Sequence, residues 1–398
     1  MDRIQIETAR DLLLSHIVPK GAEWRDISEA YGCISAEDVF APAAVPPFRR
    51  SAMDGYAVRS EDIAGAETDA PALLSVTGVL YAGDYADIVC APHTAVRVMT
   101  GSYIPDGYDA VVMQEDTDLG MEKVRVFRSV PKGRNICPVG EEFDKGELIV
   151  SRGQMIDRIA VFLLASAGIG RIRTVCRVNA AVITTGSELD DPHGALRKGH
   201  IYNGLGHAIS HALRDRGAEP LYVLHCEDDA DDIADTIQGI SGDVDIIITT
   251  GGVSVGEKDL LPQAMEKLGA KVLFHGTYIQ PGTPTMGAFY DKPILSLSGN
   301  PFAALANLDY YFPYIMAKLT GYEGHLTQVK TAVLASGYDK VNRLRRLIRA
   351  KYENGRVYLP TKGHHSSVLG DLRYCNCYID LDADTAVKIG DTVRIRMM

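Results

Sequence analysis

Three segments of the chain combine glycine with small polar or acidic residues, the types that bind anionic groups. They are Thr184-Thr185-Gly186-Ser187-Glu188, the segment 251–256 with its adjacent glycines, and Ser298-Gly299-Asn300-Pro301. Each follows an apolar, β-forming run, at 178–183, 244–249 and 293–297. Glycines at the carboxyl ends of parallel strands let backbone N–H groups approach an anion. The three segments predict a phosphate-sized pocket, with simple tight turns as the alternative.

Asn300 and Pro301 also predict the start of a helix, because asparagine is a common N-cap and proline fits the first turn. This helix extends toward Gly321, and its N-terminus adds partial positive charge to the same pocket. No lysine follows the glycine-rich segment as in a P-loop, and no G-x-G-x-x-G opens the sheet. The usual triphosphate and dinucleotide sites are therefore disfavoured.

Carboxylates accompany the glycine segments. Glu188 follows the first and Asp259 follows the second, while Asp228 belongs to a run, 227–235, with six acidic residues and no basic one. One or two carboxylates plus phosphate oxygens form a typical Mg²⁺ environment. For most of the acidic run the alternative is a helix first turn, where the helix dipole favours negative charge.

The elements that must position these residues follow from the alternation of strands and helices. Further apolar runs lie at 220–224 and 271–274, and helical patterns lie at about 203–216, 229–240, 259–268 and 301–319. Such alternation predicts a parallel sheet covered by helices on both faces. We therefore expect a three-layer α/β domain over 176–323.

The remaining sequence predicts a multidomain α/β protein. Short β-rich runs punctuated by Gly, Pro and Asp predict an inserted mixed β domain at 45–138. A helix at 5–17 and another at 156–167 fall in the flanking segments, 1–44 and 139–175, which form one N-terminal domain. Residues 324–398 are again β-rich and contain the hairpin turn Asn354-Gly355, which predicts a small C-terminal β-barrel domain.

Composition excludes several classes of protein. The chain has 398 residues, of which 46% are hydrophobic and 23% charged, which is typical of a globular protein of several domains. The net charge of −11 argues against nucleic acid as a partner. The seven cysteines form no C-x-x-C pair, and no apolar run is long enough to span a membrane. We expect reduced thiols, a cytoplasmic location and no membrane association.

Taken together, the motifs resemble those of the MoeA/gephyrin family of molybdopterin molybdenumtransferases over essentially the whole chain. The matching segments are 47–59 (Pro-Phe-Arg-Arg-Ser-Ala-Met-Asp-Gly-Tyr-Ala-Val-Arg), 97–101, 105–112 with Glu115, 185–189, 251–259 and 298–301. The resemblance implies that adenylylated molybdopterin and molybdate are converted to molybdenum cofactor and AMP, with Mg²⁺. It also implies an elongated homodimer and transient contact with a molybdopterin adenylyltransferase.

The resemblance implies site residues as well. Glu188, Asp228 and Asp259 would position Mg²⁺ and the phosphoanhydride, and Asp54 would be catalytic. Asp54 and Thr100, with Gly101 beside them, would reach in from the partner subunit. The implied pterin- and nucleotide-binding residues of the α/β domain are Thr185, Gly186, Ser187, Gly251, Gly252, Ser254, Gly256, Pro281, Gly282, Gly299, Asn300 and Pro301.

The chain departs from the family where the oxyanion is held. Gln280 and Thr283 occupy positions where the family usually has lysines, and Ala303 replaces a serine. Because a charge-assisted hydrogen bond contributes about 1.5–3 kcal/mol, losing two predicts weaker oxyanion binding by roughly two to four orders of magnitude. Arg349 and Ser366 match the family's oxyanion contacts and are retained.

Three functions remain open on the sequence. The first is a molybdenum- or tungsten-inserting enzyme with an altered oxyanion pocket. The second is a non-catalytic molybdopterin carrier or scaffold, suggested by Gln280, Thr283 and Ala303. The third is a Mg²⁺-dependent nucleotide hydrolase that uses Glu188, Asp228 and Asp259. Metal binding by His364 and His365 is disfavoured, because adjacent side chains on an extended strand point to opposite faces.

Overall fold

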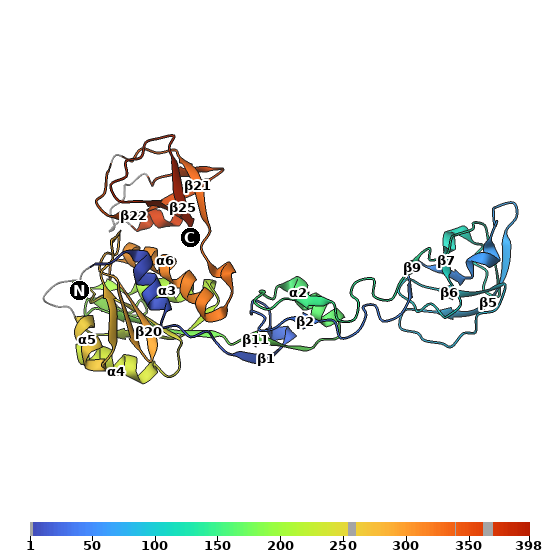
Figure 1. Cartoon of the computed structure of the whole chain (residues 1–398), viewed down its shortest axis with the longest axis horizontal. Helices are drawn as coiled ribbons and strands as arrows, with labels where there is room; N and C mark the ends of the chain where they lie inside the picture. The colour runs from blue at the N-terminus through green and yellow to red at the C-terminus, as the bar shows by residue number, and fades with distance from the viewer. Residues whose placement is uncertain (1–2, 254–259, 339, 361–368) are drawn as a thin grey trace.

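The computed structural model describes residues 3–253, 260–338, 340–360 and 369–398. The chain is elongated (Figure 1), with an α/β body at one end, a β lobe at the other and a narrow segment between them. A C-terminal β unit lies against the α/β body. None of the described helices has the length and apolar character needed to cross a membrane.

The α/β body is built on a six-stranded sheet in the order β15-β12-β16-β20-β19-β17. The strands are β12 (Val178–Thr185), β15 (Ala218–Cys226), β16 (Ile246–Thr250), β17 (Lys271–His275), β19 (Met286–Tyr290) and β20 (Lys292–Leu297). Beside the sheet, β13 (Leu189–Asp190) pairs with β14 (Ile201–Tyr202). The five predicted strands of this sheet are confirmed, and β19 is a sixth strand that the sequence did not predict.

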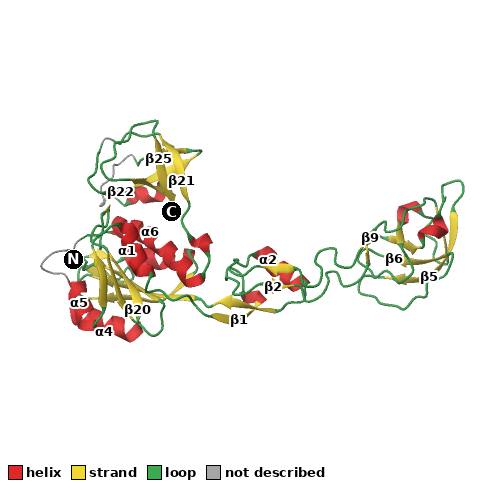
Figure 2. Ribbon diagram, viewed as in Figure 1, coloured by secondary structure: helices red, strands yellow, loops and turns green. Residues whose placement is uncertain are grey.

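Helices cover both faces of this sheet (Figure 2), which confirms the three-layer architecture. One face packs against α1 (Ile6–Leu14), α3 (Gly204–Asp215) and α6 (Pro301–Thr320), and the other against α4 (Ala230–Ile240) and α5 (Leu260–Leu268). Alternate residues of a strand supply the two cores: Val182 faces α3 and α6, while Ile183 faces α4 and α5.

The expectation of a parallel sheet is confirmed for four strands and is wrong at one edge. β12, β15, β16 and β20 are parallel, but β19 is antiparallel to both β20 and β17. β19 and β20 form a hairpin turning at Asp291, whose φ is +50°. Gly287 of β19 lies against Phe274 of β17, and a Cβ at Gly287 would come 2.3 Å from the Phe274 ring. The missing side chain of Gly287 makes room for the ring. Because glycine is a poor strand former, it also weakens the sequence pattern that would have predicted β19.

The narrow segment consists of two short antiparallel strand pairs and one helix. β1 (Ala22–Asp26) pairs with β11 (Arg171–Val175), and β2 (Val39–Phe40) pairs with β10 (Leu148–Val150). The helix α2 (Arg158–Ser166) begins at Asp157, whose carboxylate accepts a hydrogen bond from the Ala160 amide at 2.8 Å. The chain therefore leaves the body and returns to it along one ribbon.

The distant lobe is a five-stranded mixed sheet in the order β7-β4-β6-β5-β8. The strands are β4 (Gly55–Val58), β5 (Ala72–Leu80), β6 (Thr94–Val98), β7 (Ala110–Met113) and β8 (Lys123–Val126). β3 (Arg50–Ser51) pairs with β9 (Ile136–Cys137), the two points where the chain enters and leaves the lobe. This is the inserted mixed β architecture that the sequence predicts.

The C-terminal unit is a closed barrel, as predicted. Its strands are β21 (Val329–Leu334), β22 (Arg345–Glu353), β23 (Arg356–Tyr358), β24 (Cys377–Leu381) and β25 (Thr392–Met397). The order β22-β23-β21-β25-β24 closes because β24 also pairs with β22. The predicted turn Asn354-Gly355 connects β22 to β23. From the α/β body, β18 (Ile279–Gln280) adds to the barrel through β22.

Candidate functional site

The glycine loops converge where the strand order of the α/β sheet reverses. β12 lies between β15 and β16, and the chain runs from β12 to β15 on one side, then crosses back to β16 on the other. Ligands of open α/β sheets bind at such switch points, outside the carboxyl ends of the strands. The loops after β12, β16 and β20 all lie there.

Glycine is required for this convergence because the loop backbones touch. Gly251 has a φ of +91°, and a Cβ on it would come 2.5 Å from the carbonyl oxygen of Thr185. A Cβ on Gly299 would come 3.4 Å from the Cα of Gly251. The Thr185 hydroxyl donates to the carbonyl of Thr250 at 3.2 Å. These contacts join all three loops into one surface.

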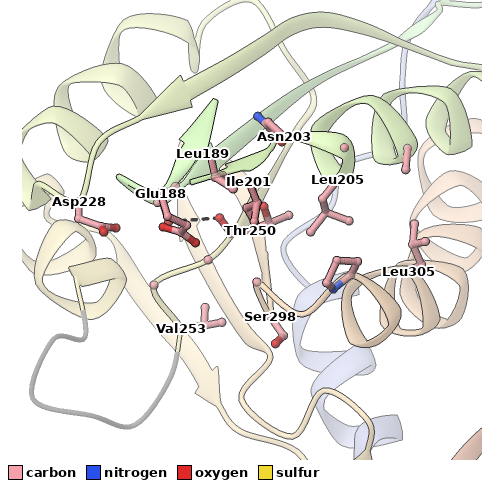
Figure 3. A pocket seen from close by; sticks show the side chains of 18 of the residues that line it. Glu188, Leu189, Ile201, Asn203, Leu205, Asp228, Thr250, Val253, Ser298 and Leu305 are labelled. Carbon is pink, nitrogen blue, oxygen red and sulfur yellow. Dashed lines mark hydrogen bonds between the residues drawn. The ribbon is translucent and has the colours of Figure 1, made fainter. Parts of the chain in front are cut away.

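This surface forms the floor of a cavity of about 1090 Å³, here called the first cavity. One end is polar and carries Glu188 and Asp228, and the opposite end is apolar and carries Leu205 and Leu305 (Figure 3). Leu369 and Leu372, from beside the barrel, complete the apolar wall. The predicted residues that line it are Thr185, Gly186, Glu188, Asp228, Gly251, Gly252, Gly299 and Pro301.

Hydrogen bonds hold the polar end together. The backbone N–H of Ser187 donates to Oδ2 of Asp228 at 3.2 Å, and the N–H of Asp228 donates to the Ser187 hydroxyl at 3.3 Å. Ser187 therefore positions Asp228 without lining the cavity itself. Glu188 and Asp228 are both exposed to the cavity and to solvent.

The acidic run divides into residues with different roles. Asp229 is the N-cap of α4, accepting hydrogen bonds from the amides of Asp231 and Asp232, which lower the pKa of its carboxyl. The helix-start interpretation is therefore correct for these residues, while Asp228 faces the first cavity. Within the described ranges no three His, Cys, Asp or Glu side chains are grouped to hold a metal ion.

A second cavity, of about 400 Å³, adjoins the first, and Pro284 and Ser298 line both. It lies between the α/β body and β22 of the barrel. Asn300 caps α6, accepting a hydrogen bond from the Ala303 amide at 3.1 Å. The predicted residues in its wall are Gln280, Pro281, Gly282, Thr283, Asn300 and Arg349.

The fold does not bring the predicted residues of the distant lobe to these cavities within one chain. Asp54 and Thr100 lie beside β4 and β6, at the far end of the molecule (Figure 1). Oδ1 of Asp54 accepts hydrogen bonds from the backbone N–H and the hydroxyl of Thr100, both at 2.7 Å. These bonds lower the pKa of the Asp54 carboxyl. Gly101, at φ +85°, forms the turn beside them.

Four predicted residues, and the adjacent histidines, lie outside the described residues. They are Ser254, Gly256, Asp259, Ser366, His364 and His365. Their proposed roles stay predictions.

Sequence reasoning missed several residues that shape the site. Asn307 of α6 is buried and donates a hydrogen bond to the carbonyl of Pro281 in the loop 280–284. A single amide on an otherwise apolar helix face could have signalled this role. Leu369 and Leu372 carry no local signal. Lys340 and Arg346 line the second cavity, and only the packing of the barrel against the body reveals them.

Comparison with known proteins places this architecture in a family. A sequence model described as the MoeA N-terminal region (domain I and II) matches residues 4–168, and one described as a probable molybdopterin binding domain matches residues 181–317. Two solved structures of MoeA proteins from Pyrococcus horikoshii superpose over 100% of this chain. Their TM-scores are 0.86 and 0.80 at 27% and 28% identity, covering 99% and 100% of those chains.

Curated relatives agree with these matches. A molybdopterin molybdenumtransferase of Staphylococcus aureus (strain COL) is 34% identical over 367 residues, covering 91% of this chain and 88% of the relative. One of Staphylococcus epidermidis (strain ATCC 12228 / FDA PCI 1200) is 31% identical, covering 98% and 94%. The chain belongs to the MoeA family of molybdopterin molybdenumtransferases.

Proposed function

We propose that this protein inserts molybdenum into adenylylated molybdopterin, consuming molybdate and releasing AMP. The observation that carries the proposal is the pair of adjoining cavities with a shared wall at Pro284 and Ser298. The first suits a long substrate with phosphate at one end and apolar surface at the other. The second holds basic residues suited to an oxyanion. Because the two cavities adjoin at Pro284 and Ser298, substrates bound in them would lie next to each other.

The first cavity supplies several groups for the phosphoanhydride. The glycine loops allow backbone N–H groups to approach phosphate oxygens, and α6 directs its N-terminus toward the boundary of the two cavities. Glu188 and Asp228 form a donor set that fits Mg²⁺, which typically takes one or two carboxylates and completes its shell with phosphate oxygens and water. When bound, Mg²⁺ would neutralise charge on those oxygens.

The test is AMP release from adenylylated molybdopterin by the purified chain, with and without molybdate and Mg²⁺. We expect AMP and active cofactor only when both are present. Release of AMP without molybdate would support the nucleotide hydrolase, and tight binding without turnover the carrier. No product even at millimolar molybdate would rule out the proposed reaction.

We also propose that the protein acts as a homodimer and that its four units are the domains 1–44 with 139–175, 45–138, 176–323 and 324–398. Asp54 and Thr100 are remote from the cavities of their own chain, so a second copy would have to bring them there. The narrow segment exposes large apolar side chains: Phe162 is 60% exposed, Trp24 58% and Ile159 54%. Such exposure on one small unit favours an interface.

Light scattering tests the dimer. Phe162→Asp should convert it to a monomer and abolish AMP release while the far-UV circular dichroism is retained. Val89→Asp, at a residue 86% exposed in the distant lobe, should leave the dimer intact. A monomeric but fully active wild type would disprove this assembly.

We further propose a cytoplasmic location and transient contact with a molybdopterin adenylyltransferase. All seven cysteines are free thiols, which suits a reducing compartment. An adenylylated pterin must come from an adenylyl transfer reaction, so the enzyme that makes it is the natural donor. Co-sedimentation with that enzyme in the presence of substrate tests the contact.

A further inference from the structure

The second cavity concentrates positive charge in an acidic protein. Among the residues described, Lys340, Arg346 and Arg349 line it, and no Asp or Glu does. The chain as a whole carries a net charge of −11. A small cavity with this lining attracts an anion, because low-dielectric walls focus the field of the basic groups. The positive charge at positions 340 and 346 comes from the barrel side and not from the loop 280–284.

The arginines of β22 and β25 do not all contribute to this charge. Arg345 donates two hydrogen bonds to the buried Asp380, at 2.7 Å each, and also pairs with Glu7 of α1. Arg396 and Arg394 pair with the same Asp380 at 2.7 Å and 3.3 Å. These three arginines are paired with carboxylates, and the contact of Arg345 with Glu7 joins the barrel to α1 of the body.

Arg346 is different, because its side chain leaves the strand on the other side and faces the cavity. Its guanidinium donates to two neutral acceptors, Oδ1 of Asn342 at 2.7 Å and Oε1 of Gln280 at 3.4 Å. None of the described carboxylates is within ion-pairing distance of it. Its charge is therefore available to a ligand of the second cavity.

Backbone pairing fixes where this charge lies. β18 and β22 are parallel, with Gln280 directly opposite Arg346. Arg349, three residues further along β22, is fully buried with its guanidinium 4.7 Å from the ring centre of Phe302 on α6. Arg346 thus lies between the loop that carries Gln280 and the buried end of the cavity. Lys340 is exposed at the rim.

We infer that Arg346 is an oxyanion-binding residue of the second cavity, with Gln280 as its neutral neighbour. The identity of the oxyanion as molybdate rests on the proposed function. A bond of 3.4 Å to an amide oxygen is long, and an anionic oxygen is a stronger acceptor for a guanidinium. The planar guanidinium can also donate two parallel hydrogen bonds to adjacent oxygens of a tetrahedral anion.

This arrangement explains why a lysine in place of Gln280 would not simply restore a missing charge. The introduced ammonium would face the Arg346 guanidinium across one register pair, where like charges repel. We therefore expect Gln280→Lys to lower the stability of the free protein and to strengthen oxyanion binding, because an anion between the two cations relieves their repulsion. The double variant Gln280→Lys with Arg346→Gln, which moves the cation across the pair, should keep most of the wild-type affinity.

The experiment is equilibrium dialysis of the full chain against molybdate, with tungstate, sulfate and phosphate as competitors. We expect Arg346→Gln to weaken molybdate binding about tenfold to a hundredfold, the loss of one charge-assisted hydrogen-bonding group. Arg346→Lys should lose less, since it keeps the charge but not the two-pronged geometry. Arg343→Gln, at an exposed arginine outside the cavity wall, should bind like wild type.

Unfolding midpoints of all variants show whether the barrel is intact. Unchanged molybdate affinity in both Arg346→Gln and Arg346→Lys would overturn the inference, as would a wild type that binds no oxyanion. A wild type that binds molybdate through Arg346 but forms no AMP would uphold the inference and disprove the proposed reaction. Molybdate-dependent AMP release that is the same in wild type and Arg346→Gln at every molybdate concentration would support the proposed reaction and contradict the inference.

Discussion

Asn307 of α6 donates a hydrogen bond from its side-chain nitrogen to the backbone carbonyl of Pro281, at 2.9 Å. The same nitrogen donates to the carbonyl of Ala303 at 2.8 Å. A Cβ on Gly282 would come 1.9 Å from it, and Gly282 has a φ of +90°. This amide therefore anchors the loop 280–284 on the helix whose first turn lies beside both cavities.

Replacing Asn307 with aspartate tests this anchor. The new carboxylate oxygen would face the carbonyl oxygens of Pro281 and Ala303 in a buried place, and the Pro281 carbonyl would lose the donor that holds it. We expect the free energy of unfolding to fall by about 1–3 kcal/mol and molybdate binding to weaken, measured by urea titration and dialysis. Gln238→Glu, the same chemical change at an exposed position of α4, should have no such effect; equal stability of the two variants would contradict the anchor.

Gly251→Ala should disrupt the floor of the first cavity. The methyl group would overlap the Thr185 carbonyl at 2.5 Å, at a φ of +91° that favours glycine. We expect a loss of about 1–3 kcal/mol in stability and of substrate binding measured by fluorescence titration with the pterin. Gly239→Ala serves as the control, because that glycine is helical with nothing within 4 Å of the added methyl. Normal pterin affinity in Gly251→Ala would show that the loops need not touch.

Glu188→Gln and Asp228→Asn should each slow AMP release and raise the Mg²⁺ concentration that gives half the maximal rate. Each removes one charged acceptor, worth about 1.5–3 kcal/mol, or roughly ten- to a hundredfold in rate or affinity. Steady-state assays over a range of Mg²⁺ concentrations measure both effects. Asp235→Asn, an exposed residue of the same acidic run that does not line the cavity, should behave like wild type. An unchanged Mg²⁺ requirement in both Glu188→Gln and Asp228→Asn would show that these carboxylates do not bind the metal ion.

The buried Asp380 predicts a pH dependence of stability. Burial alone would raise the pKa of its carboxyl, but the hydrogen bonds and charge of Arg345, together with Arg396, outweigh burial and lower the pKa from 3.8 to about 2. Because the folded-state pKa lies below the ordinary value, the ionised carboxyl stabilises the fold above pH 3.8, and this contribution is lost as the pH falls toward 2.

Asp380→Asn should therefore destabilise the chain by about 3–5 kcal/mol at neutral pH, since it leaves buried arginines without their carboxylate. It should also flatten the acid limb of the stability profile, measured by chemical unfolding at a series of pH values. Asp382→Asn, whose side chain is 68% exposed, is the matched control. An acid limb identical in wild type and Asp380→Asn would assign it to other groups.

The sequence predicts the parts of this molecule that depend on local pattern. Continuous apolar runs followed by glycine identify β12, β16 and β20 and the loops that meet at the switch point. Asn300-Pro301 identifies the start of α6, and Asn354-Gly355 the hairpin of the barrel. In each case the residues that determine the conformation are adjacent in the chain.

What the sequence does not predict depends on distant packing. β19 is missed because it contains Gly287, a poor strand former. A glycine is needed there because the ring of Phe274 occupies the place of a side chain. The charge of the second cavity is missed because Arg345 and Arg346 look alike in sequence, and only the packing of β22 against β24 and α1 shows which of them meets a carboxylate. The resemblance identifies Gln280 as a departure but cannot reveal what lies opposite it.

Along the chain, the narrow segment and the distant lobe lie between α1 and the rest of the core to which α1 belongs. Ile6, Ala9 and Leu13 are buried, and α1 packs against β17, β19 and α6, so α1 has its full set of partners only after residue 320 has been made. At 5–20 residues per second, that interval is roughly 15–60 s of synthesis. The distant lobe has its five strands within 55–126 and can fold on the ribosome meanwhile. During that time the apolar residues of α1 lack the partners that bury them in the folded chain.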